Sequence, residues 1–250
     1  MNILITGISG TLGTEFAKYL SPHHLVVGID HSEENVARFK REFPDIKVYL
    51  KDFNYWDFSL YPMDLVIHCA AHKHVNLGEE YPHDFVKNNV IKTAELFENA
   101  YDNGVDILFI STDKAVEPTS VYGYTKALGE ALCHQYDGSF ARLGNILNSN
   151  GSVLPIWEKA IKEGSPVKIT DPDMIRYYID ASEAVEQIWE GFLFGNEVII
   201  PICDKLSLIQ LFGQLVNKMG VDTEDVEVEI IGRRPGEKFE EKLTWDGEVY

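Results

Sequence analysis

The sequence predicts an α/β fold, in which a doubly wound parallel sheet carries helices on both faces. Short strand-like and helix-like segments alternate from the first residue, which is the pattern of a parallel sheet with crossover helices. Glycines follow the first strand and open the first helix. The chain has 250 residues, enough for one medium domain or for a main domain with a small second lobe.

The first part of the chain supplies the elements of this sheet. Strand-like apolar runs cover residues 2–6, 25–30, 46–50, 65–69 and 107–111. Helical patterns cover residues 12–20, 33–43, 82–103 and 122–135. The crossovers are expected to be right-handed. This order is that of a Rossmann fold, whose ligand lies beyond the carboxyl ends of the strands.

After Arg142 the alternation loosens, and residues 144–152 are polar and loop-like. Beyond them we expect helices at 153–163, 182–194 and 207–219, and strands at 167–169, 197–202 and 226–231. We therefore expect residues 1–143 to form the Rossmann domain. Residues 144–250 are expected to form a smaller C-terminal α/β substrate lobe, interleaved with the first and closing over it.

Composition narrows the classes of partner. The net charge is −18, and so acidic a surface repels nucleic acid and anionic membranes, so neither is expected as a partner. Cys69, Cys133 and Cys203 form no CxxC pair, so we expect neither a disulfide framework nor a metal site. The N-terminus reads as a strand rather than a signal peptide, and no apolar run reaches membrane-spanning length. A cytoplasmic protein is expected.

The glycines after the first strand indicate a dinucleotide site. Gly7, Gly10 and Gly13 form GxxGxxG, a spacing that lets backbone N–H groups approach a pyrophosphate at a helix N-terminus. Asp30 ends the second strand, where a carboxylate accepts hydrogen bonds from ribose and repels the 2′-phosphate of NADP. Asp30 could instead form a turn before a helix cap at Ser32. We favour NAD as the cofactor, with NADP as the alternative.

Residues after the third and fourth strands extend this site. Asp52 and Phe53 stand where the edge and face of an adenine ring would lie. Ala70 and Ala71 follow the fourth strand, where small side chains let the cofactor pass closely. All four could be ordinary loop residues, and their shared placement at strand ends favours cofactor binding.

A second cluster follows the fifth strand and predicts catalysis. Tyr122 and Lys126 form YxxxK, and positions i and i+4 share a helix face. A nearby ammonium stabilises tyrosinate, which can then act as a base. Thr112, Asp113 and Lys114 place a hydroxyl, an acid and an amine at the same strand end. A surface turn is the plain alternative, but an acid and an amine beyond those of an alcohol oxidation suggest additional proton transfers.

The motifs together resemble the extended short-chain dehydrogenase/reductase superfamily. More narrowly, the chain looks like the polysaccharide-biosynthesis group that contains the UDP-N-acetylglucosamine 4,6-dehydratases. The motifs that carry this resemblance are TGISGTLG (6–13), AAHKHV (70–75), STDKAVEPTSVYGYTK (111–126), RLGNILNSNGSVLP (142–155), ITDPDMIRYYI (169–179) and IGRRPGEK (231–238). They cover nearly the whole chain in family order, and the STDKA and RPGEK blocks are specific to the group.

The resemblance implies a role for each residue of the catalytic cluster. Tyr122 would take the proton from the sugar O4 while C4 gives hydride to the cofactor. Lys114, where retaining dehydratases have Glu, would be the base at C5, and Asp113 would protonate the departing C6 hydroxyl. Thr112 would hydrogen-bond the sugar, and Lys126 would hold the cofactor ribose. Asp-Lys in place of Asp-Glu is the pattern of the enzymes that invert C5.

The resemblance also implies a cofactor site and a site for UDP. The cofactor-binding residues are Gly7, Ser9, Gly10, Thr11, Leu12, Gly13, Asp30, Asp52, Phe53, Ala70, Ala71, Tyr122 and Lys126. The substrate-binding residues are Lys73, Asn145, Thr170, Arg176, Arg234 and Glu237. Arginine suits bidentate phosphate contacts, although a surface salt bridge is the plain alternative for each arginine.

The chain departs from the group in three respects. Residues 148–150 read Asn-Ser-Asn where members often have Gly-Ser-Arg. Members often continue past RPGEK, and near the second strand many carry a pattern compatible with NADP. Those members commonly assemble through a bundle that contains the YxxxK helix, so we expect a homo-oligomer.

Three functions remain open from the sequence. The first is a 4,6-dehydratase that inverts C5 of a UDP-sugar. The second is a UDP-sugar 4-epimerase or 4-ketoreductase, which needs Tyr122 and Lys126 but not Asp113 and Lys114. The third is a dinucleotide-binding protein without catalysis, in which the intact cluster would have no purpose.

Overall fold

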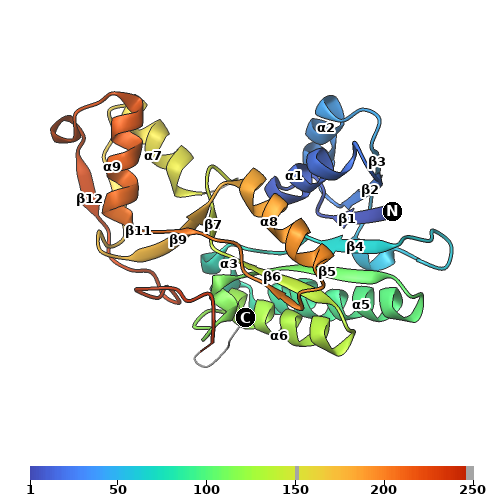
Figure 1. The fold of residues 1–250 in the computed structure, drawn as a ribbon. Coiled ribbons are helices and arrows are strands. Elements are labelled where there is room, and N and C mark those ends of the chain that lie inside the picture. Colours follow the sequence, from blue (N-terminus) through green and yellow to red (C-terminus); the bar gives the residue numbers. More distant parts are fainter. Residues whose placement is uncertain (150–151, 246–250) are drawn as a thin grey trace.

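The computed structural model describes residues 1–149 and 152–245 (Figure 1). Its main sheet has seven parallel strands in the order β10-β6-β5-β4-β1-β2-β3. In chain order these are β1 (Asn2–Thr6), β2 (Leu25–Asp30), β3 (Lys47–Leu50), β4 (Leu65–His68), β5 (Asp106–Thr112), β6 (Ser139–Leu143) and β10 (Val198–Ile199). The predicted doubly wound parallel sheet is confirmed.

Helices cover both faces of this sheet. One face carries α1 (Thr11–Leu20), α2 (Glu33–Glu42) and α8 (Ala181–Leu193), and the other carries α5 (Lys92–Asp102) and α6 (Val121–Gln135) (Figure 1). Alternate strand residues divide between the two cores, because successive side chains of a strand point to opposite faces. In β1, Ile3 and Ile5 pack with α1, α2 and α8, whereas Leu4 packs with α5 and α6.

The segment predicted as one helix at 82–103 is divided. It consists of α4 (Pro82–Val86), a π-helical turn (Lys87–Ile91) and α5. A π turn inserts an extra residue into a helix and often lies at a functional site. Here it carries the buried Asn89, whose amide pairs with the backbone N–H and C=O of His72 at 2.8 Å each. The short helix α3 (Val75–Glu80) precedes it and was not predicted.

The second lobe has two small sheets and its own core. One sheet orders β11 (Asp204–Ser207), β9 (Ile175–Ile179) and β7 (Asn145–Ile146), and the other pairs β12 (Val228–Ile230) with β8 (Val167–Ile169). The helices α7 (Val153–Lys162) and α9 (Leu208–Met219) pack on these sheets, and a 3-10 turn follows at Thr223–Asp225. Trp157 and Phe212 meet edge-on in the core, with ring centroids 5.9 Å apart.

The two lobes exchange chain segments. After β9 the chain returns to the main sheet, where α8 packs against α1 and β10 pairs with β6. It then re-enters the second lobe at β11. The predicted division at residues 143 and 144 stays a prediction. In the described parts of the chain, no helix combines the length and apolar character needed to cross a membrane.

Residues 234–245, named here the C-terminal strap, return from the second lobe to the main domain (Figure 1). Within the strap, Glu240 forms a parallel bridge with Ile175 of β9. The strap then passes the loop after β5, where Lys242 forms an ion pair with Glu117 at 2.7 Å. The strap thus joins both lobes through polar contacts rather than through an apolar core.

A buried ion pair fixes α6 to the main sheet. The Arg142 guanidinium of β6 donates to both carboxylate oxygens of Glu130 on α6, at 2.9 to 3.1 Å. The hydroxyl of Ser111 on β5 donates to the same carboxylate. The Glu130 and Arg142 side chains are only 8% and 3% exposed, so each charge depends on the other for its solvation.

We predict that Arg142→Leu lowers the free energy of unfolding by about 3–5 kcal/mol, because it leaves the Glu130 carboxylate buried without its cation. The double variant Glu130→Leu/Arg142→Leu is expected to be more stable than that single variant. Urea denaturation measures both. Lys162→Leu is the control, since its pair with Glu158 is exposed and contributes about 0.5 kcal/mol or less. Equal losses in Arg142→Leu and Lys162→Leu would contradict this prediction.

Candidate active site

A cleft of about 930 Å³ lies at the carboxyl ends of the main strands, between the sheet and the second lobe. Most residues predicted for the site line it. They are Gly7, Gly10, Thr11, Leu12, Gly13, Asp30, Ala71, Lys73, Thr112, Lys114, Tyr122, Lys126, Asn145, Thr170, Arg176, Arg234 and Glu237. One cleft therefore joins the glycine turn, the catalytic cluster and the residues predicted for UDP.

The glycine turn after β1 is closely packed. Gly7 has φ +64°, and a Cβ there would lie 2.9 Å from the Ala70 backbone. A Cβ at Gly13 would lie 2.3 Å from the Gly7 carbonyl oxygen, so α1 approaches the turn closely because position 13 has no side chain. Ala70 contacts the turn but does not line the cleft, whereas its small side chain was predicted to lie where the cofactor passes closely.

Asp30 is held in place by the turn and by α2. Its Oδ2 accepts hydrogen bonds from the backbone N–H and the hydroxyl of Ser9, and its Oδ1 accepts one from the backbone N–H of Ser32. Ser9 is therefore turned toward Asp30 rather than into the cleft. Ser32 caps α2, so Asp30 combines the predicted turn contact with a place on the cleft wall.

This end of the cleft fits a dinucleotide. Glycine positions line it where side chains would fill the space, and the N-terminus of α1 faces it. Among the described residues no side chain caps α1, and its first turn contains no acidic residue, so the positive end of the helix is left for an anion. A carboxylate stands at the end of β2, where such folds bind the adenosine ribose.

Two residues predicted near the adenine ring lie outside the cleft lining. Phe53 is 5% exposed and packs in the core under α5. Asp52 caps the 3-10 turn Phe53–Tyr55 and forms an ion pair with Lys92. Asp52 is held by the turn that it caps and by Lys92, forty residues away, and Phe53 is held by core packing. Their predicted role in binding a cofactor stays a prediction.

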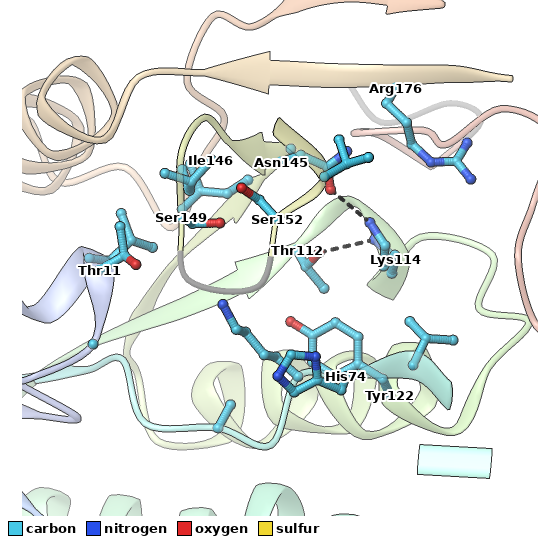
Figure 2. A pocket seen from close by; sticks show the side chains of 18 of the residues that line it. Thr11, His74, Thr112, Lys114, Tyr122, Asn145, Ile146, Ser149, Ser152 and Arg176 are labelled. Carbon is cyan, nitrogen blue, oxygen red and sulfur yellow. Dashed lines mark hydrogen bonds between the residues drawn. The ribbon is translucent and has the colours of Figure 1, made fainter. Parts of the chain in front are cut away.

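The catalytic cluster is assembled at the end of β5. Thr112 ends the strand and caps the 3-10 turn Asp113–Ala115. Lys114 Nζ lies 2.9 Å from Asp113 Oδ1. It also lies 3.5 Å from Asn145 Oδ1, which reaches over from β7 (Figure 2). Asp113 is completely buried behind the lining, and its Oδ2 has no hydrogen-bond partner among the described residues. An orphaned acceptor beside a cleft is suited to a ligand hydroxyl.

Helix α6 brings Tyr122 to this cluster. Ser120 caps the helix by accepting from the backbone N–H of Gly123. A Cβ at Gly123 would lie 2.4 Å from the carbonyl oxygen of Lys114, so glycine is needed for the helix to approach the turn. Tyr122 consequently points toward Thr112 and Lys114 (Figure 2).

Burial sets the proton affinities in the cleft. It raises the pKa of Tyr122 to about 12, against the Lys114 charge and a hydrogen bond with Thr112, which lower it. Burial lowers the pKa of Lys126 to about 7, which the charge of Glu130 opposes. Burial by itself would lower the pKa of Lys114, but the charges of Asp113 and Glu241 outweigh it, so the pKa is raised.

Lys126 is directed into the sheet. Its ammonium donates to the carbonyl of Ile110 on β5 and lies 3.9 Å from the ring centroid of Phe109. It shares a helix face with Tyr122 and lines the same cleft. The predicted YxxxK geometry on a helix after the fifth strand is present.

Three of the residues predicted for UDP also hold chain segments in place. Arg176 on β9 donates to the carbonyls of Lys238 and Phe239 at 2.8 and 3.1 Å, so its guanidinium also anchors the strap. The backbone N–H of Arg234 donates to the Glu237 carboxylate at 3.0 Å, which closes the RPGE turn. These contacts explain the position of each residue, and the binding of UDP stays a prediction.

Several lining residues were not singled out from the sequence. His74, Asn76, Lys168 and Tyr178 add polar groups, and burial raises the pKa of Tyr178 to about 12. His74 lies inside the AAHKHV motif and Tyr178 inside ITDPDMIRYYI, and these motifs were signals for them, whereas Asn76 and Lys168 lie outside the motifs. Of the Asn-Ser-Asn sequence, Asn148 and Ser149 line the cleft and Asn150 lies outside the described residues. Residues 1–149 and 152–245 contain no metal-binding group of three or more His, Cys, Asp or Glu.

The fold and this cleft define the class of protein. A glycine turn after β1, an acid at the end of β2 and a YxxxK helix after β5 are the parts of an extended short-chain dehydrogenase/reductase. The chain belongs to the family described as Polysaccharide biosynthesis protein, which matches residues 3–250.

The proteins that the chain resembles have several different names. The chain is 38% identical to the uncharacterized membrane protein MJ1061 of Methanocaldococcus jannaschii, over 99% of this chain and 81% of that protein. It is 30% identical to the inverting UDP-N-acetylglucosamine 4,6-dehydratase of Campylobacter jejuni, over 100% of this chain and 81% of the relative. The probable polysaccharide biosynthesis protein EpsC of Bacillus subtilis is 32% identical over 99% of this chain, which spans only 46% of EpsC.

A solved structure shows the same fold over nearly the whole chain. Pen from Bacillus thuringiensis superposes with a TM-score of 0.89 at 29% identity, covering 97% of this chain and 83% of Pen. The dTDP-glucose 4,6-dehydratase DesIV from Streptomyces venezuelae, solved with NAD and TYD bound, has a TM-score of 0.83 over 98% of this chain and 88% of DesIV. Its 20% identity supports the fold alone.

We predict that Gly7→Ala destabilises the protein by about 1–2 kcal/mol, because alanine resists a left-handed conformation, and that it weakens dinucleotide binding by moving the turn. Gly213→Ala is the matched control, since its Cβ would meet nothing within 4 Å. Within α9 it is expected to add about 0.5–1 kcal/mol and to leave binding unchanged. Urea unfolding and calorimetric titration with NAD measure both effects. Unchanged binding in Gly7→Ala would contradict the assignment of the turn.

Proposed function

We propose that the protein is a NAD-dependent nucleotide-sugar 4,6-dehydratase that acts on UDP-N-acetylglucosamine and inverts C5. The observation that carries this proposal is the Asp113–Lys114 pair, held at 2.9 Å beside Tyr122 at the end of β5. Oxidation of an alcohol needs one base, whereas elimination of water also needs a base at C5 and an acid at the C6 hydroxyl. The similarity to an inverting dehydratase supports the same reaction.

The glycine turn, the N-terminus of α1 and Asp30 are the groups that would hold NAD. When bound, NAD would supply a reversible hydride acceptor for the oxidation at C4 and the reduction at C6. The Asp30 carboxylate favours NAD because it would repel the 2′-phosphate of NADP.

Tyr122 is proposed to accept the O4 proton. Its phenol must first lose a proton, and burial opposes that loss. The Lys114 ammonium favours the phenolate, because a cation stabilises negative charge. The Thr112 hydroxyl donates to Asp113 Oδ1 at 2.9 Å, and it would favour the phenolate by turning to donate to Tyr122 instead. Thr112 is also placed to bind a sugar hydroxyl, since it lines the cleft beside Tyr122.

Asp113 and Lys114 are proposed to divide the elimination. The C4 ketone acidifies the C5 proton, the Lys114 amine takes that proton, and the C6 hydroxyl leaves as water with a proton from Asp113. When hydride returns to C6, C5 takes a solvent-derived proton on its opposite face, which inverts that carbon. The required amine and carboxylic acid form when one proton passes from Lys114 to Asp113 along their hydrogen bond. The unpartnered Oδ2 of Asp113 is the acceptor or donor available to the C6 hydroxyl.

The second lobe is proposed to bind the UDP moiety. Lys73, Lys168, Arg176 and Arg234 line the cleft, and they gather positive charge in a protein whose net charge is −18. Diphosphate carries the negative charge that such a group attracts. Asn145, Thr170 and Glu237 add the hydrogen-bonding groups that fix orientation.

A UDP-sugar 4-epimerase is the second candidate. The UDP-glucose 4-epimerase of Rickettsia rickettsii is 28% identical over 99% of this chain and 78% of that protein. An epimerase would use Tyr122 and Lys126 in the same way and would leave the C6 hydroxyl in place. The two candidates therefore differ in whether Asp113 and Lys114 are needed.

We predict that the purified protein converts UDP-N-acetylglucosamine in deuterated water to a 4-keto-6-deoxy sugar. NMR should show a new methyl signal and deuterium at C5, with couplings that report inversion. A C4-epimerised sugar that keeps its C6 hydroxyl would establish the epimerase instead. Binding of NAD without conversion of any UDP- or dTDP-hexose would favour the dinucleotide-binding protein without catalysis.

We predict that Asp113→Asn slows elimination about 10²- to 10⁴-fold, the usual contribution of a general acid. Oxidation at C4 should persist, so reduced nicotinamide is expected to accumulate in its absorbance band when substrate is added. Glu163→Gln is the matched control, because this carboxylate is 57% exposed and pairs with Lys159 outside the cleft lining. Full activity in Asp113→Asn would contradict the dehydratase.

We predict that Thr112→Val moves the acidic limb of the pH–rate profile to higher pH. The lost hydrogen bond lowers the pKa of Tyr122 in the parent protein, so removing it raises that pKa and a higher pH is needed to form the phenolate. Thr112→Ser keeps the hydroxyl and should keep the limb. The initial rate of C4 oxidation, followed by absorbance between pH 6 and 10, is the measurement. A limb that is the same in both variants would contradict this role.

A further inference from the structure

A buried carboxylate behind Lys114 has no part in the reaction described above. Glu241 of the C-terminal strap is 3% exposed, and its Oε1 lies 3.9 Å from Lys114 Nζ. Its Oε2 lies 2.9 Å from Lys238 Nζ. It does not line the cleft. Burying the charge of the Glu241 carboxylate costs free energy. Its position beside the ammonium groups of Lys114 and Lys238 therefore needs an explanation.

The strap fixes Glu241 from both sides along the chain. Lys238 donates to the carbonyl of Val116 at 2.6 Å, and Arg176 donates to the carbonyls of Lys238 and Phe239. Beyond Glu241, Arg142 donates to the carbonyl of Leu243 at 3.4 Å. The carboxylate is therefore held by the backbone on each side.

Lys114 lies in a surplus of negative charge. Asp113 faces it from its own turn and Glu241 from the strap, while the cation that faces it is Arg176 on β9. Tyr122 on α6 and Tyr178 on β9 are the titratable phenols beside it. Both carboxylates favour the ammonium form, which agrees with a pKa that is raised although burial opposes it. The strap thus contributes to the basicity of Lys114.

We propose that Glu241 is a positioning residue of the catalytic centre, which acts through Lys114 by stabilising the positive charge that Lys114 gains at C5. This rests on the proposed function. A carboxylate 3.9 Å behind the nitrogen makes the amine a stronger base and orients it between Asp113 and Asn145. The competing explanation is that Glu241 only neutralises Lys238 and fastens the strap.

The direct test is the titration of Lys114 in protein labelled with 13C at the lysine ε carbons. NMR follows each ε-CH2 signal with pH, and Lys114→Arg identifies the signal of Lys114 by its loss. Glu241→Gln keeps the shape and removes the charge, so the pKa of Lys114 is expected to fall by about one unit or more. Glu240→Gln is the matched control: this adjacent carboxylate is 42% exposed and pairs with Lys205. It should leave the titration unchanged, and equal shifts in the two variants would overturn the proposal.

A kinetic test separates this role from fastening of the strap. In Glu241→Gln, deuterium incorporation at C5 should reach half its maximum at lower pH, and its maximal rate should fall because the base is weaker. Lys242→Gln loosens the strap by removing its pair with Glu117 and should change the rate without moving the pH dependence. A Glu241→Gln profile that falls uniformly at every pH would favour fastening alone and overturn the proposal.

The two proposals can fail separately. If the parent protein converts no sugar nucleotide, the proposed function fails, and the NMR titration still decides whether Glu241 controls the charge of Lys114. If Glu241→Gln does not fold, Glu241→Asp moves the charge away by one methylene. The pKa of Lys114 should then fall by a smaller amount, and an unchanged pKa would overturn the proposal.

Discussion

The close approach of α6 to the end of β5 determines where the groups predicted for catalysis lie. Gly123 has no side chain, and so the helix comes within contact of the Lys114 carbonyl, where a Cβ would stand only 2.4 Å away. Tyr122 precedes this glycine and Lys126 follows it by almost one turn. The same contact therefore brings the phenol beside Thr112 and directs the Lys126 ammonium into the cleft floor. The Glu130–Arg142 pair holds the next turn of α6 against β5 and β6.

In this acidic protein, several cations in and near the cleft are paired with buried carboxylates. Glu130 with Arg142, Asp113 with Lys114 and Glu241 with Lys238 are each buried or nearly so. A buried pair costs solvation energy in both partners, so it persists where geometry supplies further hydrogen bonds. Each of these pairs also receives a contact from another element, which ties the lobes together. The solvation energy lost by burying these ion pairs is thus offset by the hydrogen bonds and ion pairs that they form between elements.

The sequence predicted the fold wherever strands are uniformly apolar. β1, β2, β4 and β5 are buried on both faces, and a continuous apolar run is the pattern of such a strand. β6 and β9 were missed because each carries a buried arginine, whose partners come from distant segments. The strap was not predicted, because side chains that donate to its backbone carbonyls produce no hydrophobic periodicity in the sequence. The glycine turn and YxxxK were predicted because their spacing is local, whereas Glu241 acts across more than a hundred residues.

The position of the strap has a consequence for how the cleft responds to its surroundings. Arg176 lines the cleft and at the same time donates to strap carbonyls, while Glu241 on that strap faces Lys114. An anion that draws the Arg176 guanidinium toward the cleft would compete with those carbonyls for its N–H groups. Anion binding and strap position would then be coupled through the Arg176 side chain, and each would alter the free energy of the other by the same amount. A segment without regular structure can in this way control the chemistry at the end of a rigid sheet.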